Sequence, residues 1–293
     1  KTNLAKITDG AVEFDGTGDY LEISDNTDLD LGDSDFTIEG FVYVSAESGS
    51  RQTFVAKGTG TDNQASYHIA LDTSETWIYY LSSNGSTWDV SSAVTIGESR
   101  LNSWQHIALV RSGNTITPYL DGVAGTPTTT SATIFDGNKP FTIGADDPGN
   151  QKLNGFTSNV RVIKGTALYT SDFTPPTEPL TNVTNTVLLC CQSTTSAFAA
   201  AVTPAAFTPR MGGYRFTTAK VYSTYGGGAR AANYSVQYSD DNSNWTTAWS
   251  GNMSNNSSCG IQQGTGSGNP GAHRYWRYVE GGATTGHHPR VSR

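Results

Sequence analysis

Apolar and polar positions alternate along most of this chain of 293 residues. In the segment DFTIEGFVYV (35–44), Phe36 and Ile38 fall on one side of an extended chain and Thr37 falls on the other. Apolar repeats with the period of about 3.6 residues that marks a helix are hard to find. The pattern therefore predicts an all-β protein built from many short strands.

Turn signals separate the expected strands. The pair Asp121-Gly122 favours the positive φ angles of tight hairpins, and Ser-Gly-Asn at 112–114 marks another turn. The expected strands of the first part of the chain are residues 10–14, 20–24, 35–44, 53–58, 66–72, 76–83, 86–92, 104–113, 115–123, 139–146, 155–165 and 185–191. About a dozen short strands in roughly 170 residues predict a two-sheet jelly-roll sandwich.

The rest of the chain predicts a second, smaller domain. Residues 166–180 are rich in proline, which cannot donate to a strand ladder, so they should lie extended along the sandwich surface. We expect a jelly-roll domain at 1–192, an Ala-, Thr- and Pro-rich linker at 193–213 and an all-β domain at 214–293. The chain starts at Lys1 without a signal peptide and ends in a strand-like stretch, so we interpret it as part of a longer polypeptide.

Charge is distributed unevenly between the two halves. Residues 1–185 carry 10 Lys and Arg against 23 Asp and Glu, a net charge of 10 − 23 = −13. Residues 186–293 carry 8 against 3, a net charge of 8 − 3 = +5, and the two sum to the −8 of the chain. The break supports two units with different surfaces. An acidic first half argues against nucleic-acid binding, because clustered Lys and Arg neutralise phosphates.

The cysteines and the hydropathy restrict the setting of the protein. Cys190 and Cys191 are adjacent and Cys259 is far from them, which predicts buried thiols in a protein synthesised in a reducing cytoplasm rather than a disulfide framework. No apolar run approaches the length of about 20 residues that a membrane span requires. We therefore expect no membrane span.

Several motifs of the first domain resemble a known family. The motifs are FDGTGDYLEI (14–23), DFTIEGFVYV (35–44), WQHIALVRSGNTITPYLDG (104–122), FTIGA (141–145) and FTSNVRVIKGTALYT (156–170). They resemble laminin-G-like, concanavalin A-like jelly-roll domains. The run from VRVIKGTALYTSDFTPPTEPLT to NTVLLCCQS is similar to the version found in tail fibre and virion proteins of tailed bacteriophages, especially marine ones.

The second domain resembles discoidin-like (galactose-binding-like) β-sandwiches. Its motifs are YSVQYSDDNSNWTTAW (234–249) and HRYWRYVEGG (273–282). Discoidin-type domains end a strand in Tyr-Ser-x-Asp and resume at a Trp, as at Tyr238, Ser239, Asp241 and Trp245. The usual domain is longer, so this copy is either abbreviated or cut off at Arg293.

The two resemblances imply a non-enzymatic protein that recognises carbohydrate. They suggest part of a phage tail fibre or surface appendage, displayed on the virion surface or otherwise extracellular. Its partners would be a host cell-surface glycan, other virion proteins and further copies of itself, for example in a trimer. The alternatives are a secreted bacterial lectin-like adhesin and the carbohydrate-binding module of a larger glycosidase.

A catalytic site of the glycosidase type is incomplete. Glycoside hydrolases of this fold carry Glu-x-Asp-x-(x)-Glu on one strand, so that the carboxylates point into a single cleft. Here Glu13 and Asp15 have the first part of that spacing, but Thr17 and Gly18 occupy the third position. The acid/base pair cannot be completed from this strand, which predicts that the chain is not an enzyme.

Calcium is the metal that the acidic loops could hold. Asp15 and Asp19 flank a Gly-Thr-Gly turn, whose carbonyls can approach a cation beside the two carboxylates. The resemblance suggests a structural calcium, in which Asn159 takes the place of an acidic residue of many relatives. Asp146 and Asp147 form a second candidate cluster. The alternative is that these aspartates cap their turns.

Exposed aromatic and polar side chains are the candidates for sugar binding. Trp77, Tyr79 and Trp88 lie on strands in the middle of the first domain, where flat rings could stack on a sugar. Alternation places Tyr80 on the opposite face from Trp77 and Tyr79, so one of the two sets belongs to the core. In the second domain we expect His287, His288 and Arg290 to form a ligand-binding loop; an exposed polar loop is the alternative.

Overall fold

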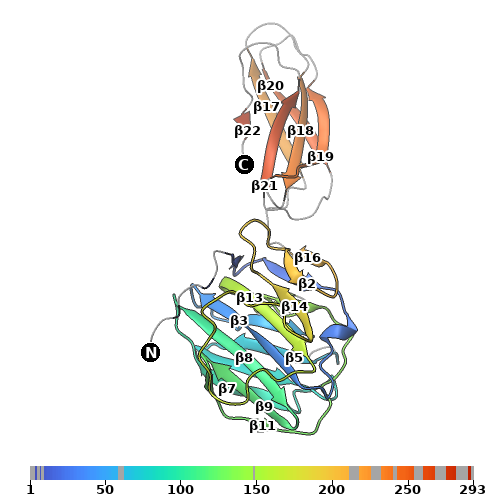
Figure 1. Ribbon diagram of the computed structural model, residues 1–293. Helices are drawn as coiled ribbons and strands as arrows, with labels where there is room; N and C mark the ends of the chain where they lie inside the picture. Colours follow the sequence, from blue (N-terminus) through green and yellow to red (C-terminus); the bar gives the residue numbers. More distant parts are fainter. Residues whose placement is uncertain are drawn as a thin grey trace. The chain divides into compact units, whose positions relative to one another are not determined.

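The chain divides into two compact units, Lys1–Arg210 and Met211–Arg293. The computed structural model describes Leu4, Ile7 and residues 10–58, 63–147 and 149–210 of the first unit. In the second unit it describes residues 218–225, 232–239, 243–253, 260–267, 275–281 and 290–291. These residues form antiparallel strands almost throughout (Figure 1), which confirms the all-β prediction. No helix in the described ranges is long and apolar enough to cross a membrane.

A nine-stranded sheet forms one layer of the first unit (Figure 1). Its order is β10 (Val123–Ala124), β9 (Thr115–Leu120), β8 (Trp104–Ser112), β3 (Phe36–Val44), β13 (Asn154–Lys164), β14 (Thr186–Cys190) and β15 (Ala200–Val202), with β1 (Val12–Asp15) on β13 and β11 (Thr128–Thr129) on β9. β3 lies between β8 and β13 and pairs antiparallel with both, so its side chains lie in the middle of the layer.

A seven-stranded sheet forms the other layer. Its order is β16 (Phe207–Arg210), β2 (Tyr20–Ile23), β12 (Phe141–Ile143), β4 (Gln52–Lys57), β5 (Tyr67–Leu71), β6 (Thr76–Leu81) and β7 (Ser91–Glu98). Neighbouring strands in the chain, such as β5 and β6, pair as hairpins, whereas β12 lies between β2 and β4 although it follows both by more than eighty residues of sequence. The two sheets form the predicted jelly-roll sandwich.

One apolar core fills the space between the two sheets. Alternate residues of each strand enter it, for example Ile38 of β3 and Tyr67 of β5, both fully buried. Each such side chain contributes about 1.5–3 kcal/mol by leaving water. Cys190 and Cys191 also lie in this core as free thiols, as the sequence predicts.

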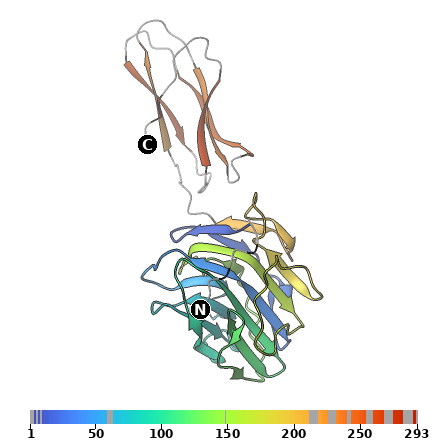
Figure 2. The same cartoon turned by 60° about the vertical axis from the view of Figure 1, so that its left-hand side comes forward.

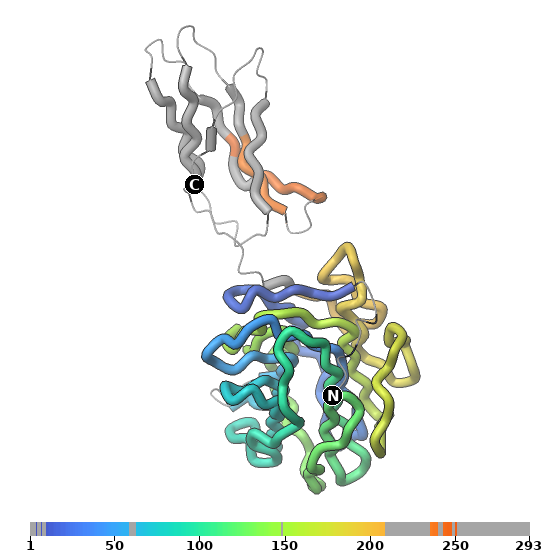
Figure 3. Tube along the Cα trace, turned by 90° about the vertical axis from the view of Figure 1, so that its left-hand side faces the viewer, coloured from blue at the N-terminus to red at the C-terminus, as the bar shows by residue number. Residues whose placement is uncertain are grey.

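The predicted linker at 193–213 is partly wrong. Residues 200–202 form β15, which pairs with β14, and residues 207–210 form β16, which pairs with β2. In Figure 3 the yellow segment before residue 210 lies against the first, blue strands. This stretch has no clear alternation of its own, and Pro209 is tolerated in β16 because β16 is an edge strand. Residues 200–202 and 207–210 become strands because they pair with β14 and β2 at the edges of the two sheets.

The proline-rich segment 166–181 lies over the outer face of the nine-stranded sheet, and we call it the strap (Figure 1). Thr37 Oγ1 donates to the Thr166 carbonyl at 3.1 Å and accepts from the Leu168 amide at 3.0 Å. The Phe173 amide donates to the carbonyl of Gly122 at 2.9 Å. The expected extended path along the surface is therefore confirmed, and the strap covers polar side chains of β3 and β8.

A buried carboxylate joins the strap to the sheet. Glu39 of β3 is fully buried. Its Oε1 accepts from Arg161 Nε at 2.9 Å and Nη2 at 2.6 Å, and its Oε2 accepts from Tyr169 Oη at 2.8 Å and lies 3.1 Å from His106 Nε2. Burial alone would raise the pKa of Glu39, but His106 and Arg161 outweigh it and hold this pKa below its ordinary value. Arg161 also donates to the Thr181 carbonyl at 2.8 Å, at the end of the strap.

The second unit contains two three-stranded antiparallel sheets (Figure 2). One has the order β20 (Gly260–Ser267), β17 (Thr218–Tyr225) and β22 (Arg290–Val291). The other has the order β19 (Thr246–Met253), β18 (Ala232–Ser239) and β21 (Tyr275–Gly281). Val236 and Ser239 of β18 are buried.

Replacing Glu39 by glutamine should destabilise the first unit strongly. Glu39→Gln leaves Arg161 buried without its countercharge, which costs about 3–5 kcal/mol when one partner of a buried ion pair is removed. Chemical denaturation followed by tryptophan fluorescence measures the change. Glu178→Gln, at an exposed position of the same strap, is the matched control and should have no measurable effect.

The same carboxylate makes stability depend on pH. Because the folded-state pKa of Glu39 is lowered, its contribution is fully present above the unfolded value of about 4.3 and is lost as pH falls through the folded-state pKa. The stability difference between wild type and Glu39→Gln should therefore shrink in acid. An equal difference at neutral and acid pH would contradict this role.

Candidate functional site

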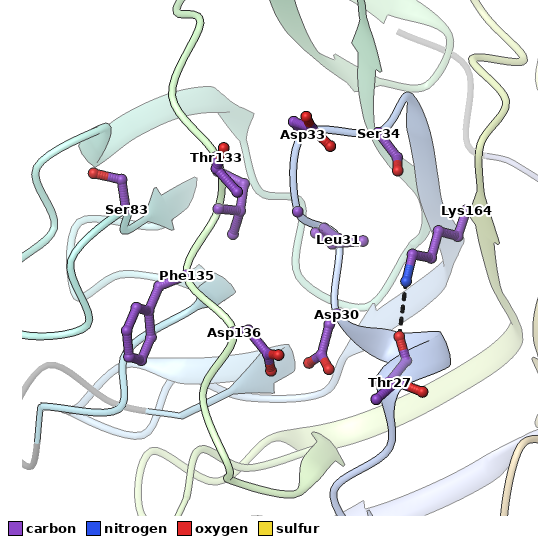
Figure 4. Close-up of a pocket in the computed structure, with 12 residues that line it drawn as sticks. Thr27, Asp30, Leu31, Asp33, Ser34, Ser83, Thr133, Phe135, Asp136 and Lys164 are labelled. Atoms are coloured by element: carbon purple, nitrogen blue, oxygen red, sulfur yellow. Dashed lines mark hydrogen bonds between the residues drawn. The ribbon is translucent and has the colours of Figure 1, made fainter.

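A pocket of about 500 Å³ lies in the first unit (Figure 4). The residues that line it come from segments 27–34 and 133–136, from Ser83 in the loop after β6 and from Lys164 at the end of β13. Lys164 Nζ donates to the Thr27 carbonyl at 2.8 Å, in the short 3-10 helix η1 (Thr27–Leu29). Segments distant in sequence therefore meet at one concave site.

Buried Arg111 fixes the walls of the pocket. Its Nη1 donates to the carbonyls of Gly32 at 3.2 Å and Ala132 at 2.9 Å, which holds the two lining segments together. The backbone adds further links, because the Phe135 amide donates to the Ser82 carbonyl at 2.8 Å. The site is thus held in shape by the protein itself, before any ligand binds.

A second buried cation lies beneath the acidic side of the pocket. Lys57 is fully buried, and its Nζ lies 2.7 Å from Asp25 Oδ1 and 2.8 Å from Asp30 Oδ1. It also donates to the carbonyl of Gly137. One ammonium thus holds two carboxylates and the segment that follows the pocket wall.

The acidic side chains exceed what Lys57 can neutralise. The carboxylates of Asp30 and Asp136 point toward each other in Figure 4. Burial raises the pKa of Asp30 and the Asp136 carboxylate raises it further, although Lys57 opposes both effects. Asp33 adds a third carboxylate to the lining. The lining therefore carries three carboxylates and one cation, Lys164, with Lys57 buried beside Asp30.

The chemistry of the lining suits a ligand with many hydroxyl groups. Carboxylates accept hydrogen bonds from hydroxyls, and such charge-assisted bonds are stronger than neutral ones. The hydroxyls of Ser34 and Thr133 can donate or accept, and Phe135 supplies apolar surface. The hydroxyl of Ser83 donates to Asp89 and can only accept from a ligand. A few fixed polar groups around an apolar surface are typical of small-ligand sites.

The assignment of Trp77 and Tyr79 to ligand binding is wrong. Both side chains are fully buried in the core, where Trp77 Nε1 donates to Gln105 Oε1 at 3.3 Å and Tyr79 Oη lies 2.7 Å from Thr128 Oγ1. Alternation separates them from Tyr80 as expected, but it does not say which set meets the other sheet. The expected strand at 86–92 is wrong, because β7 begins at Ser91 and Trp88 lies in the loop before it. Trp88 is half-buried beside Tyr80, on the side of the sheet away from the core.

Asp15 accepts hydrogen bonds from its own turn. Its Oδ1 accepts from the amides of Thr17 at 2.8 Å, Gly18 at 2.9 Å and Asp19 at 3.3 Å, and its Oδ2 accepts from Thr17 Oγ1 at 2.6 Å. Burial would raise the pKa of Asp15, but these hydrogen bonds outweigh it and lower the pKa. The arrangement is that of a turn cap.

Asp146 and Asp147 also have local partners. Asp146 is buried, and its carboxylate accepts from the Asn150 amide at 2.6 Å and from Gln151 Nε2 at 2.8 Å. Asp147 Oδ2 lies 3.2 Å from Lys139 Nζ. Donor groups therefore face the oxygens that a cation would need.

Asn159 lies apart from both acidic loops. It occupies a β-bulge of β13 with a φ of 55°, a conformation that Asn tolerates better than most residues. Its Oδ1 accepts from the Leu180 amide at 2.8 Å and from Gln192 Nε2 at 2.6 Å. Because β1 pairs with β13 at Asn154 rather than at Asn159, the buried amide does not join Asp15.

The predicted calcium ligands do not fit a cation in this arrangement. The oxygens of Asp15, Asp146 and Asn159 accept from N–H or O–H donors, whereas calcium requires six to eight oxygen ligands. Within the described ranges there is no group of three or more His, Cys, Asp and Glu side chains that could hold a metal ion. Calcium binding remains a prediction for a titration to decide.

The candidates of the second unit lie largely outside the described residues. His287 and His288 are not among them. Arg290 lies on β22 and pairs with Tyr222 of β17. Their assignment to a ligand-binding loop stays a prediction.

One feature of the sequence, a segment rich in aspartate, marks a wall of the pocket, although the predicted strands do not reveal the pocket. The stretch NTDLDLGDSD (26–35) concentrates four aspartates in a segment with little alternation. Such a stretch is an ordinary solvated turn unless something else meets it. Lys57 and Asp136, its partners in the pocket, follow at distant positions that no local spacing connects.

A family comparison identifies the class of protein. A model for laminin-G-type domains of the concanavalin A-like lectin/glucanases superfamily matches residues 15–169, just over half of the chain. The chain belongs to this superfamily. Comparison with curated proteins finds no match.

Solved structures with a similar arrangement are distant in sequence. A candidate carbohydrate-binding protein from Bacteroides ovatus is 14% identical, with a TM-score of 0.46, over 69% of this chain and 59% of its own. A SAP-like pentraxin from Limulus polyphemus is 18% identical, with a TM-score of 0.42, over 56% and 80%. Trypanosoma rangeli sialidase is 16% identical, with a TM-score of 0.41, over 54% and 26%. Similarities of this size carry no argument about function.

Replacing Asp15 by alanine should destabilise the first unit by about 1–2 kcal/mol, because several amides of the turn lose their acceptor. The loss should be the same with excess calcium and with a chelator. Thermal unfolding in both buffers measures it. Calcium-dependent stabilisation that disappears in Asp19→Ala would instead support a metal site at this turn.

Proposed function

We propose that this chain is a non-enzymatic carbohydrate-recognition protein and that the pocket of Figure 4 is a binding site for the sugar. The observation that carries the proposal is a preformed concave site lined by three carboxylates and several hydroxyls, with Phe135 as an apolar wall. Membership of a superfamily of lectins and glucanases is consistent with it, but the site is the reason.

The physical basis is the competition of the site with water. A sugar hydroxyl gives up a hydrogen bond to water when it binds, so the site must offer stronger acceptors already in place. Asp136 and Asp33 are charged acceptors on segments that Arg111 and backbone hydrogen bonds hold together. A site held in advance loses little conformational entropy when the ligand arrives.

The absence of catalysis is part of the proposal. Glu13 and Asp15 are exposed on β1, and Asp15 caps its own turn. No third carboxylate follows at the position that a glycosidase strand would require. In the proposed site the carboxylates of the pocket act as hydrogen-bond acceptors.

The setting that we propose is a phage virion. The motifs at 156–191 support a tail fibre or surface appendage, and those at 234–249 support a discoidin-like second module. In that setting the protein would bind a host cell-surface glycan, contact other virion proteins and assemble with copies of itself at the virion surface. A secreted lectin-like adhesin, or the binding module of a larger glycosidase, is equally compatible with the fold. The coding sequence on either side decides between them.

Removing one carboxylate of the pocket should weaken glycan binding. A glycan array first identifies a ligand, and calorimetry then compares the wild type with Asp136→Asn. Loss of one charged hydrogen bond costs about 1.5–3 kcal/mol, or roughly a tenfold to a hundredfold rise in Kd. Ser34→Ala should give a smaller loss in the same direction.

Glu13→Gln is the matched control, because it neutralises an exposed carboxylate on β1, outside the pocket lining. It should leave the affinity unchanged. Wild-type affinity in Asp136→Asn would place the binding site elsewhere. A protein that binds no glycan at all would refute the proposed function.

A further inference from the structure

A second group of side chains lies on the outer face of the seven-stranded sheet, away from the core. Trp88, in the loop after β6, packs on Tyr80 of β6 with ring centroids 5.3 Å apart and near His68 of β5 at 6.4 Å. His68 and Tyr80 stack at 5.8 Å. On the other sheet, the strap packs against the outer face at Ala108, Val110 and Tyr119.

Tyr80 has a polar group without a partner. The residue is 4% exposed, and its hydroxyl forms no hydrogen bond within the part of the chain that the structure describes. A buried hydroxyl in this condition raises the free energy of the folded protein. A ligand that supplies an acceptor would remove that cost.

Arg51 supplies a charge at the same place. Its guanidinium carbon lies 5.2 Å from the centroid of the Tyr80 ring, and the side chain is exposed. Within the described residues it forms no ion pair within 4 Å, and the nearby Asp72 is committed to its own turn through Ser74 and Thr76. The planar guanidinium of Arg51 can therefore bind a carboxylate by donating two parallel hydrogen bonds to its oxygens.

His68 does not add a second charge. Its Nε2 lies 2.9 Å from Thr53 Oγ1. Burial, followed by the charge of Arg51, lowers the pKa of His68 to about 3, so the ring is neutral at physiological pH. Arg51 is the group on which attraction of an anion depends.

We propose that Arg51, Tyr80 and Trp88 form a second binding site, for an acidic sugar residue of the uronic acid class. The sugar ring lies against Trp88, and its carboxylate pairs with Arg51. As Arg51 turns toward the carboxylate it leaves the Tyr80 ring, which allows the hydroxyl of Tyr80 to donate to the ligand.

The site is distinct from the pocket but lies within reach of it. Ser83, which lines the pocket, and Trp88 belong to the same loop and are five residues apart, so their Cα atoms are at most about 18 Å apart. Asp89 holds the base of this loop through the Ser83 amide at 2.9 Å and the Ser83 hydroxyl at 2.6 Å. One acidic polysaccharide could therefore contact both places.

The test is a titration with galacturonate oligomers and with uncharged galactose oligomers of the same length. Calorimetry gives the affinity, and tryptophan fluorescence reports contact with Trp88. The uronate should bind at least tenfold more tightly than the neutral sugar, and added salt should weaken it. Arg51→Gln should abolish this preference, and Arg51→Lys should restore only part of it because the ammonium lacks the planar fork. Trp88→Ala should reduce affinity at least tenfold, and Trp88→Phe should retain most of it.

Lys220→Gln is the matched control, because it removes a positive charge from β17 of the second unit. It should not change the affinity for uronate. Arg51 is exposed, so its variants should fold even if Trp88→Ala does not. Equal binding of neutral and acidic oligomers, unchanged uronate affinity in Arg51→Gln, or binding of sulfated sugars without uronate would each overturn the proposal. Loss of this site alone leaves the sugar pocket, which is tested through Asp136→Asn, unaffected.

Discussion

The carboxylate of Glu39 is the constraint on which the first unit depends. A charge in the middle of a sheet is tolerated only where donors surround it, and Arg161, His106 and Tyr169 come from two neighbouring strands and from the strap. Detachment of the strap would remove the Tyr169 donor and the cover over the Glu39 carboxylate, which would then be exposed or left with fewer hydrogen bonds. The attached strap covers part of the outer face of the nine-stranded sheet, at Ala108, Val110 and Tyr119.

The pocket uses the same principle in another place. Lys57 and Arg111 are buried cations that hold loops rather than ligands, through Asp25, Asp30 and the carbonyls of Gly32 and Ala132. These contacts fix the loops but leave Asp136 and Asp33 with acceptor capacity at the surface of the pocket. Structural ion pairs thus create a polar concavity, and its chemistry follows from the acidic side chains that they do not neutralise.

Membership of the superfamily accounts for the sandwich fold, whereas the two candidate sites depend on particular side chains of this chain. The same sandwich serves proteins that bind sugars and proteins that cleave them. In this chain β1, the strand that could carry a catalytic carboxylate set, contains Glu13 and Asp15 and ends there, before a glycine-rich turn. The proposed binding groups, Arg51, Trp88 and the pocket carboxylates, lie on loops or beside the outward face of one sheet.

The amino-acid sequence by itself determined most of the strands, the turns and the surface course of the strap, because period-two alternation, Asp-Gly pairs and prolines act locally. It placed one strand at 86–92, where the structure has a loop followed by β7 from Ser91. It could not say which face of β6 meets the core, since alternation separates Trp77 from Tyr80 without orienting either. It also missed β15 and β16, whose pairing is decided by sheet edges formed elsewhere. Asp30, Lys57 and Asp136 meet only after the sandwich closes, so the pocket was decided by tertiary structure.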